Sequence, residues 1–109
     1  MLPSSHRLPK EAIDGVVRYG ARVTTDALTL RYKKKTGAAR FAFIVSTKVD
    51  KRATQRNRIR RTVSESVGHL LTKISPLDGT ITIRRNIAPL SQQNVELLVV
   101  ALFKKAHML

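Results

Sequence analysis

The sequence contains no cysteine and no tryptophan, and only seven of its residues are acidic. The absence of cysteine excludes disulfides and thiolate metal sites. The three histidines, His6, His69 and His107, are far apart in the chain and show no metal-ligand spacing. The few acidic residues form no pair with one another or with histidine that suits acid–base catalysis. We therefore expect no stably bound cofactor, and a self-sufficient enzyme is the least favoured interpretation.

Long apolar runs are also missing. The longest, residues 95–103, is interrupted by Glu96 and is far too short to cross a bilayer. Residues 1–10 lack the apolar segment of a secretory signal. These features predict a cytoplasmic protein without a membrane partner.

Positive charge is the abundant property of this chain. Lysine and arginine together number 21 against seven acidic residues, which gives a formal net charge of +14 over 109 residues. Such an excess destabilises the compact state through self-repulsion, and a polyanionic partner is the usual compensation. A nucleic acid is favoured over a membrane surface, because no basic amphipathic helix with a large aromatic face is visible.

The chain length fits one domain, residues 1–109, and an apolar content of 42% is enough for a modest core. Apolar residues at helical spacing predict three helices, in residues 9–20, 51–71 and 91–103. Pro9 suits the first turn of the first helix, Gly20 its end, and Ser91 the N-cap of the last. Alternating apolar and polar residues predict three strands, in residues 28–32, 41–46 and 81–83. Residues 33–37 then form a hairpin loop, and the whole is an α+β domain with a mostly antiparallel sheet.

The strongest functional signal lies in residues 51–61. On a helical wheel, the apolar stripe that begins at Ile59 continues toward the N-terminus as Arg56 and Arg52. The simplest geometry is a helix whose last turns pack on the sheet while its first turns overhang it. Cations at a helix N-terminus oppose the dipole by about 0.3–1 kcal/mol each, and the only acid within the helix is Glu65. This arrangement favours a phosphate-binding surface over a solvated basic face.

At this motif the chain resembles the bacterial ribonuclease P protein family. In that family an Arg-Asn-Arg helix follows a strand that ends in Ser-Lys-Lys-Val. Here residues 40–49 read RFAFIVSTKV and residues 56–61 read RNRIRR. Weaker agreement in residues 1–8, at Gly20 and in residues 97–105 extends the resemblance over nearly the whole chain.

The resemblance implies a two-layer domain in the order αβββαβα, similar to the second domain of ribosomal protein S5. Its four-stranded sheet would be mostly antiparallel and accompanied by three helices. The implied function is that of a protein subunit of ribonuclease P, the endonuclease that removes the 5′ leader from precursor tRNA. The partners would be the catalytic RNA and precursor tRNA, with the protein a monomer in the ribonucleoprotein. Hydrolysis, assisted by magnesium, would belong to the RNA.

Site residues follow from the resemblance by position. Six residues are candidate contacts to RNA: Arg52, Arg56, Asn57, Arg58, Arg60 and Arg61. Strand alternation places four residues in the core: Leu28, Leu30, Phe41 and Phe43. It places five on the opposite face, which would be the floor of a cleft for the leader: Thr29, Arg31, Ala42, Ile44 and Ser46. Lys48 would lie at the rim, and an ordinary solvated sheet face remains the alternative to a cleft.

The chain also departs from the family pattern. Ile13 and Val17 stand where the family often has two phenylalanines that line the cleft, and both cleft and core remain open for them. An aliphatic side chain contacts a base but does not stack on it as an aromatic ring does. Asp50 replaces a family glycine and is a candidate N-cap, and Ser64 replaces an arginine. These changes bear on how strongly a leader is held.

Two other classes share some of these features. A general RNA-binding module, such as a ribosomal protein or an RNA chaperone, could use the same basic helix. A helix-turn-helix DNA reader is less favoured, because predicted strands flank the basic helix on both sides.

Overall fold

The computed structural model describes residues 2–109. Three α-helices are present in this part of the chain: α1 (Lys10–Tyr19), α2 (Ala53–Gly68) and α3 (Gln92–Lys105). The four strands are β1 (Ala21–Thr24), β2 (Leu28–Lys34), β3 (Arg40–Ile44) and β4 (Leu77–Ile83). Two short 3₁₀ helices, η1 (Ser4–His6) and η2 (Leu71–Lys73), complete the elements. The predicted α+β class and the order αβββαβα are confirmed.

The strands form one sheet in the order β1-β2-β4-β3. Strand β2 pairs antiparallel with both β1 and β4, whereas β3 runs parallel to β4. The prediction of a hairpin loop at residues 33–37 was therefore wrong, because β4 lies between β2 and β3. Ile81 and Ile83 of β4 are almost fully buried, so burial of the late strand in the middle of the sheet outweighs pairing between sequence neighbours.

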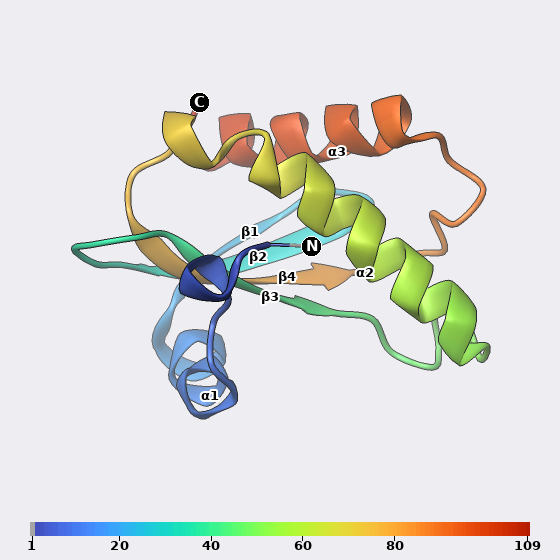
Figure 1. Ribbon diagram of the computed structural model, residues 1–109, viewed down its shortest axis with the longest axis horizontal. Coiled ribbons are helices and arrows are strands. Elements are labelled where there is room, and N and C mark those ends of the chain that lie inside the picture. Colours follow the sequence, from blue (N-terminus) through green and yellow to red (C-terminus); the bar gives the residue numbers. More distant parts are fainter. Residues whose placement is uncertain (1) are drawn as a thin grey trace.

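Helices α2 and α3 cover one face of the sheet, and α1 lies on the other face (Figure 1). The main core fills the space between the sheet and α2 and α3. Its fully buried members include Leu28, Leu30 and Ile81 from the sheet, Ile59, Val63 and Val67 from α2, and Val99, Leu102 and Phe103 from α3. The predicted core positions Leu28, Leu30 and Phe41 are confirmed, and Phe41 packs its ring 6.0 Å from that of Phe103. Phe43 faces the same side but remains half-buried.

The element boundaries differ from expectation at two points. Strand β1 was not predicted from the residues, since its four residues alternate only weakly in polarity. Strand β3 ends at Ile44, two residues earlier than predicted, because the chain then turns and the amide of Val49 donates to the carbonyl of Ser46 at 3.1 Å. The predicted cap of the last helix is confirmed, since Ser91 Oγ accepts a hydrogen bond from the amide of Asn94 at 3.2 Å.

The N-terminal segment, residues 2–8, is docked on the domain. The amide of Leu8 donates to the carbonyl of Phe41 at 2.9 Å, and Arg7 forms a parallel bridge with the same residue. Leu2 and Leu8 are buried. An exposed strand edge is a site for unwanted pairing, and this segment covers part of the outer edge of β3.

Candidate nucleic-acid interface

The start of α2 extends past the sheet, as predicted. Ile59 is the first buried residue of the helix, and none of residues 53–58 is buried. Figure 1 shows this end of α2 reaching beyond the tips of β3 and β4. The helix therefore has a packed C-terminal part and an N-terminal part that projects its side chains into solvent.

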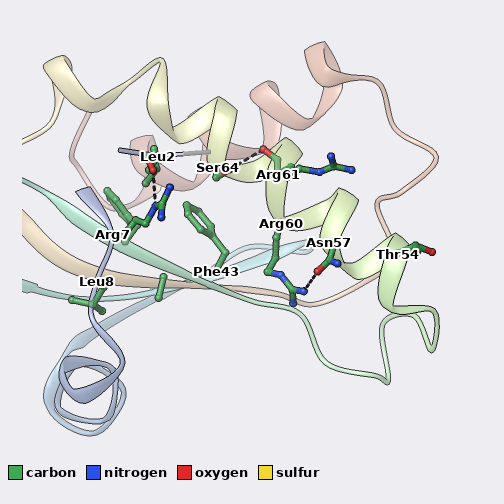
Figure 2. A pocket seen from close by; sticks show the side chains of 11 residues that line it. Leu2, Arg7, Leu8, Phe43, Thr54, Asn57, Arg60, Arg61 and Ser64 are labelled. Carbon is green, nitrogen blue, oxygen red and sulfur yellow. Dashed lines mark hydrogen bonds between the residues drawn. The ribbon is translucent and has the colours of Figure 1, made fainter. Parts of the chain in front are cut away.

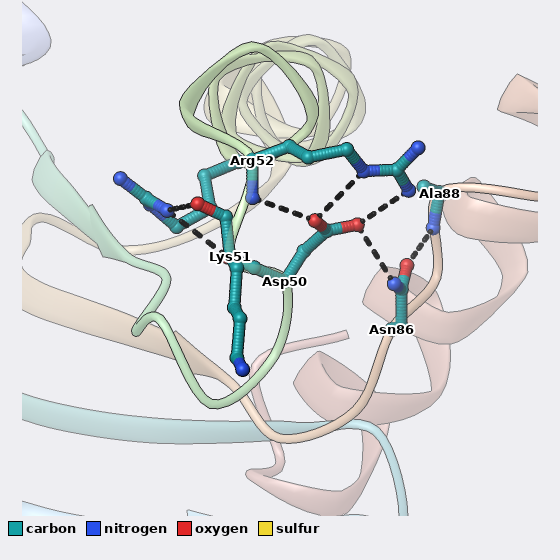
Figure 3. A network of polar contacts seen from close by, with 6 residues as sticks. Asp50, Lys51, Arg52, Asn86 and Ala88 are labelled. Carbon is teal, nitrogen blue, oxygen red and sulfur yellow. Dashed lines mark hydrogen bonds and ion pairs between the residues drawn. The ribbon is translucent and has the colours of Figure 1, made fainter.

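A carboxylate just outside the helix holds this projecting end (Figure 3). Asp50 Oδ1 accepts from the backbone amide of Arg52 at 2.9 Å and from its Nε at 3.1 Å, and Oδ2 accepts from its Nη2 at 2.9 Å. These hydrogen bonds from Arg52 hold the pKa of the Asp50 carboxyl well below its usual range. Although Glu65 is the only acid within the predicted helix, Arg52 thus has an acidic partner just before it. The prediction of Asp50 as the N-cap was wrong, because Arg52 occupies that position; Asp50 lies two residues earlier and binds the amide of the N-cap residue instead.

The same carboxylate reaches the loop that follows β4. Asn86 Nδ2 donates to Asp50 Oδ2 at 3.0 Å, and Asn86 Oδ1 accepts from the amide of Ala88 at 3.0 Å. Arg56 folds back over the helix start and donates from Nη1 to the carbonyls of Asp50 at 3.0 Å and Lys51 at 2.8 Å. Arg56, predicted as an RNA contact, is therefore also a structural residue of this loop.

The other four predicted contact residues divide into two pairs. Arg60 Nη2 donates to Asn57 Oδ1, so these two side chains support one another. Arg58 and Arg61 are exposed, and no acidic side chain within residues 2–109 lies at ion-pair distance from either of them. Among the described residues, Arg58 and Arg61 are the arginines of this motif whose guanidiniums make neither an ion pair nor a hydrogen bond within the protein.

The sheet face away from α2 and α3, here called the open sheet face, carries most of the predicted cleft floor. Strand register places Thr29 and Ile44 on either side of Thr82, and Arg31 and Ala42 on either side of Thr80. Ser46 does not belong to this face as predicted, since β3 ends at Ile44 and Ser46 lies exposed in the following loop. Lys48, predicted at the rim, is exposed in the same loop. Thr29 is buried, whereas Arg31, Ala42 and Ile44 are partly exposed. The accessible floor is consequently narrower than predicted.

Helix α1 covers one end of the open sheet face. Val16 is its buried residue, Ile13 is half-buried, and Val17 is 37% exposed. The end of α1 approaches β2 so closely that a Cβ on Gly20 would lie 2.4 Å from the Val16 carbonyl oxygen and 2.9 Å from that of Tyr32. Because Val16 is buried, it packs the helix against the sheet, whereas Val17 lies at the side of the open sheet face.

Arg22 is a candidate site residue that the sequence pattern did not indicate. It lies directly opposite Arg31 in the pairing of β1 with β2. Like charges at opposed positions of neighbouring strands are destabilising, and an anion over this end of the sheet would relieve the repulsion. Only the pairing register, which depends on β1, reveals this cluster.

A second concavity lies on the other side of β3, between the N-terminal segment and α2 (Figure 2). This N-terminal hollow has a volume of about 600 Å³ and is lined by Leu2, Arg7, Leu8, Phe41, Ala42, Phe43, Thr54, Asn57, Arg60, Arg61 and Ser64. Of these residues, the sequence indicated a functional role only for Asn57, Arg60 and Arg61 of α2 and for Ala42, which was expected in the cleft floor instead. Residues 2–8 give no local signal for it, because the wall that they form depends on docking against β3.

Together, the fold and site define a class: a small, strongly cationic α+β domain that projects a basic helix end beside a polar sheet face that α1 covers only in part. The family model described as "Ribonuclease P" matches residues 2–107. The chain belongs to the ribonuclease P protein family, the protein component of a ribonucleoprotein endoribonuclease that processes tRNA, and its partner is ribonuclease P RNA. The resemblance inferred from residues 40–61 is thereby confirmed.

Relatives of known family agree with this assignment. The ribonuclease P protein component of Synechococcus elongatus is 33% identical over 90 residues, which cover 76% of this chain and 74% of that protein. The component of Nitrosomonas eutropha is 30% identical over 109 residues, covering 96% and 90%. Among solved structures, the Staphylococcus aureus RNase P protein superimposes with a TM-score of 0.85 at 18% identity, over 96% of this chain and 98% of that one. The structural match bears out the fold.

None of the helices in residues 2–109 is both long and apolar enough to cross a membrane.

Proposed function

We propose that this protein binds the catalytic RNA through the start of α2 and binds the 5′ leader of precursor tRNA on the open sheet face. In this way it assists endonucleolytic removal of the leader during tRNA 5′ maturation. The observation that supports the proposal most strongly is the projecting end of α2, where Arg58 and Arg61 have no acidic partner among the described residues.

The α2 surface suits a folded RNA. Arg58, Arg60 and Arg61 lie within one turn of one another, and arginine donates to phosphate through a planar fork. The Asp50 contacts hold the helix start in place, so these guanidiniums are presented on a fixed backbone. A rigid cationic surface matches a partner whose phosphates are themselves held in a fixed arrangement.

The open sheet face suits an extended single strand. Threonine and alanine side chains allow close approach, Ile44 offers an apolar contact, and Arg22 and Arg31 offer charge at one end. Few groups on this face could read a base edge, so binding would depend on backbone charge and apolar contact. Val17 and Ile13 of α1 would form the side of the path, with weaker base contacts than aromatic rings provide.

The chemistry itself would belong to the RNA. Among residues 2–109, no group of three or more His, Asp or Glu side chains is placed to hold a metal ion. The role proposed for this chain is to bind and orient the two RNAs and to offset their mutual repulsion.

Reconstitution tests the proposal. The purified protein, the catalytic RNA from the same genome, and both together are incubated with a precursor tRNA at low magnesium. We expect cleavage at the mature 5′ end to be fast only with both components. The control replaces this protein with a non-cognate basic protein of equal charge. If this protein were only a general RNA chaperone, the control protein would stimulate cleavage equally, and both proteins would accelerate annealing of unrelated RNAs.

A further inference from the structure

We infer that the N-terminal hollow holds a single unstacked nucleotide of the catalytic RNA, with the base against Phe43 and the phosphate near Arg7 and Arg60. This inference rests on the proposed function, since it requires the catalytic RNA to lie along α2. It adds a binding site on the opposite side of β3 from the open sheet face.

The floor of the hollow is aromatic. The rings of Phe41 and Phe43 are 6.4 Å apart between centroids and tilted by only 22°, so they form a nearly continuous layer. Phe41 is buried, whereas Phe43 leaves part of its ring exposed to the hollow. Leu2 and Leu8 complete the apolar wall. Unpaired bases of RNA are bound by stacking on exposed aromatic faces of this kind.

The rim of the hollow is cationic. Three arginines line it, and none of the lining residues that the structure describes is acidic. Arg7 Nε donates to the carbonyl of Leu2 at 2.7 Å, which leaves its two terminal nitrogens for another acceptor. In the view of Figure 2, the Phe43 ring lies between the side chains of Arg7 and Arg60. A phosphate beside an apolar floor would offset the repulsion among these arginines.

A polar group is also placed to contact a base edge. Asn57 Oδ1 accepts from Arg60, so its Nδ2 is left to donate. A hollow of about 600 Å³ lies within the roughly 300–1,000 Å³ range of small-molecule sites. The hollow therefore matches a nucleotide: the aromatic floor and the Asn57 amide would contact the base, and the guanidiniums at the rim would contact the phosphate.

The hollow is formed before any RNA binds. Its N-terminal wall is held by the hydrogen bond from Leu8 to Phe41 and by His6 Nδ1, which donates to the carbonyl of Ala39 at 2.8 Å. Because the wall is fixed, binding requires little ordering of the protein.

The neighbouring surface indicates which RNA supplies the nucleotide. The hollow shares Asn57, Arg60 and Arg61 with the projecting part of α2. The leader is proposed to lie across the sheet on the far side of β3. The catalytic RNA, proposed to lie along α2, is therefore the RNA that can place an unpaired nucleotide in the hollow.

The test uses the reconstituted holoenzyme with three variants of the protein. Phe43→Leu keeps the apolar volume but removes the aromatic ring, whereas Phe43→Tyr retains the ring. Leu97→Ala, on the exposed side of α3, is the control. We measure the affinity for the catalytic RNA, the melting temperature, the preference for precursor over mature tRNA, and base-specific chemical probing of the RNA. Loss of one stacked base should weaken RNA binding roughly tenfold for Phe43→Leu.

The expected pattern is selective. Phe43→Leu should bind the catalytic RNA more weakly and expose one unpaired base to the probe, while Phe43→Tyr and Leu97→Ala match the wild type. The preference for precursor tRNA should stay unchanged. The inference is overturned if Phe43→Leu binds the catalytic RNA as tightly as the wild type. It is overturned too if Phe43→Tyr binds as weakly as Phe43→Leu and both variants have a lowered melting temperature. It is also overturned if the precursor preference alone is lost, which would assign the nucleotide to the leader. If the proposed function is wrong, the wild-type protein itself will not stimulate cleavage of precursor tRNA by the catalytic RNA.

Discussion

Asn86 donates a hydrogen bond from Nδ2 to Asp50 Oδ2 at 3.0 Å, across 36 positions of the sequence. This contact ties the loop after β4 to the turn that starts α2. The same carboxylate accepts a hydrogen bond from the amide of Arg52, the N-cap residue of α2. The orientation of the projecting helix end is therefore set partly by a residue far from the basic motif.

Asn86→Ala should loosen the start of α2 with little loss of global stability. The variant removes the amide that joins the two loops, while the Asp50–Arg52 contacts remain. We expect faster hydrogen exchange at the amides of residues 52–56 and weaker binding of the catalytic RNA. Asn94→Ala, at an exposed side chain of α3, is the matched control. Unchanged exchange in this turn would show that Asp50 and Arg52 suffice to hold it.

Arg58→Ala and Arg56→Ala should behave differently, although both lie in the motif. The Arg58 side chain has no hydrogen-bond or ion-pair partner among residues 2–109, so its removal should leave the melting temperature unchanged. It should weaken RNA binding and reduce the slope of log affinity against log salt by about one. Arg56 donates to two carbonyls, and its removal should cost about 1–2 kcal/mol of stability. Thermal melts and a salt titration of RNA binding separate the two roles.

Ile44→Glu should impair binding of the leader. It places a carboxylate on the open sheet face beside Thr82, where it would repel the phosphates of a strand lying there. In the wild-type holoenzyme, we expect affinity for precursor tRNA to exceed that for mature tRNA and to rise with leader length. Affinity measured with leaders of increasing length should lose this rise in Ile44→Glu but keep much of it in the uncharged Ile44→Gln. A folded Ile44→Glu protein that binds leaders normally would move the leader site to another surface.

Asp78 should make the fold sensitive to acid. Its carboxylate accepts from Arg40 Nε at 2.9 Å and Nη2 at 2.8 Å, joining β3 to β4, and this contact lowers its pKa. A lowered pKa in the folded state gives stability that is complete above the ordinary carboxyl range near pH 4 and is lost as pH falls through the folded pKa. Asp78→Asn should cost about 1 kcal/mol at neutral pH, between typical values for exposed and buried pairs.

Urea unfolding between pH 2 and pH 7 checks this prediction. The wild type should lose more stability than Asp78→Asn as the pH falls below about 4. The control is Asp14→Asn, because the Asp14–Arg18 pair is exposed on α1. Parallel pH profiles for the wild type and Asp78→Asn would show that the Arg40 contact contributes nothing.

Local pattern was enough for much of the fold. The apolar spacing of Ile59, Val63 and Val67 predicted a helix that packs only at its C-terminal part, because a 3.6-residue period places those side chains on one face. Ser91 was predicted as a cap because a hydroxyl there can accept from an amide of the first turn. Alternation at residues 28–32 fixed which side chains of β2 face the core. The RNRIRR motif indicated both the family and the basic surface.

Tertiary structure decided what depends on distant partners. Strand β4 lies between β2 and β3, with Ile81 and Ile83 buried in the core, and no local pattern encodes that position. The pairing of Arg22 with Arg31 depends on β1, and the N-terminal hollow depends on residues 2–8 docking against β3. The sequence by itself determined the charge, the periodicities and the motif. Only the folded chain could bring Asn86 to Asp50, 36 positions away, and so join the loop after β4 to the start of α2.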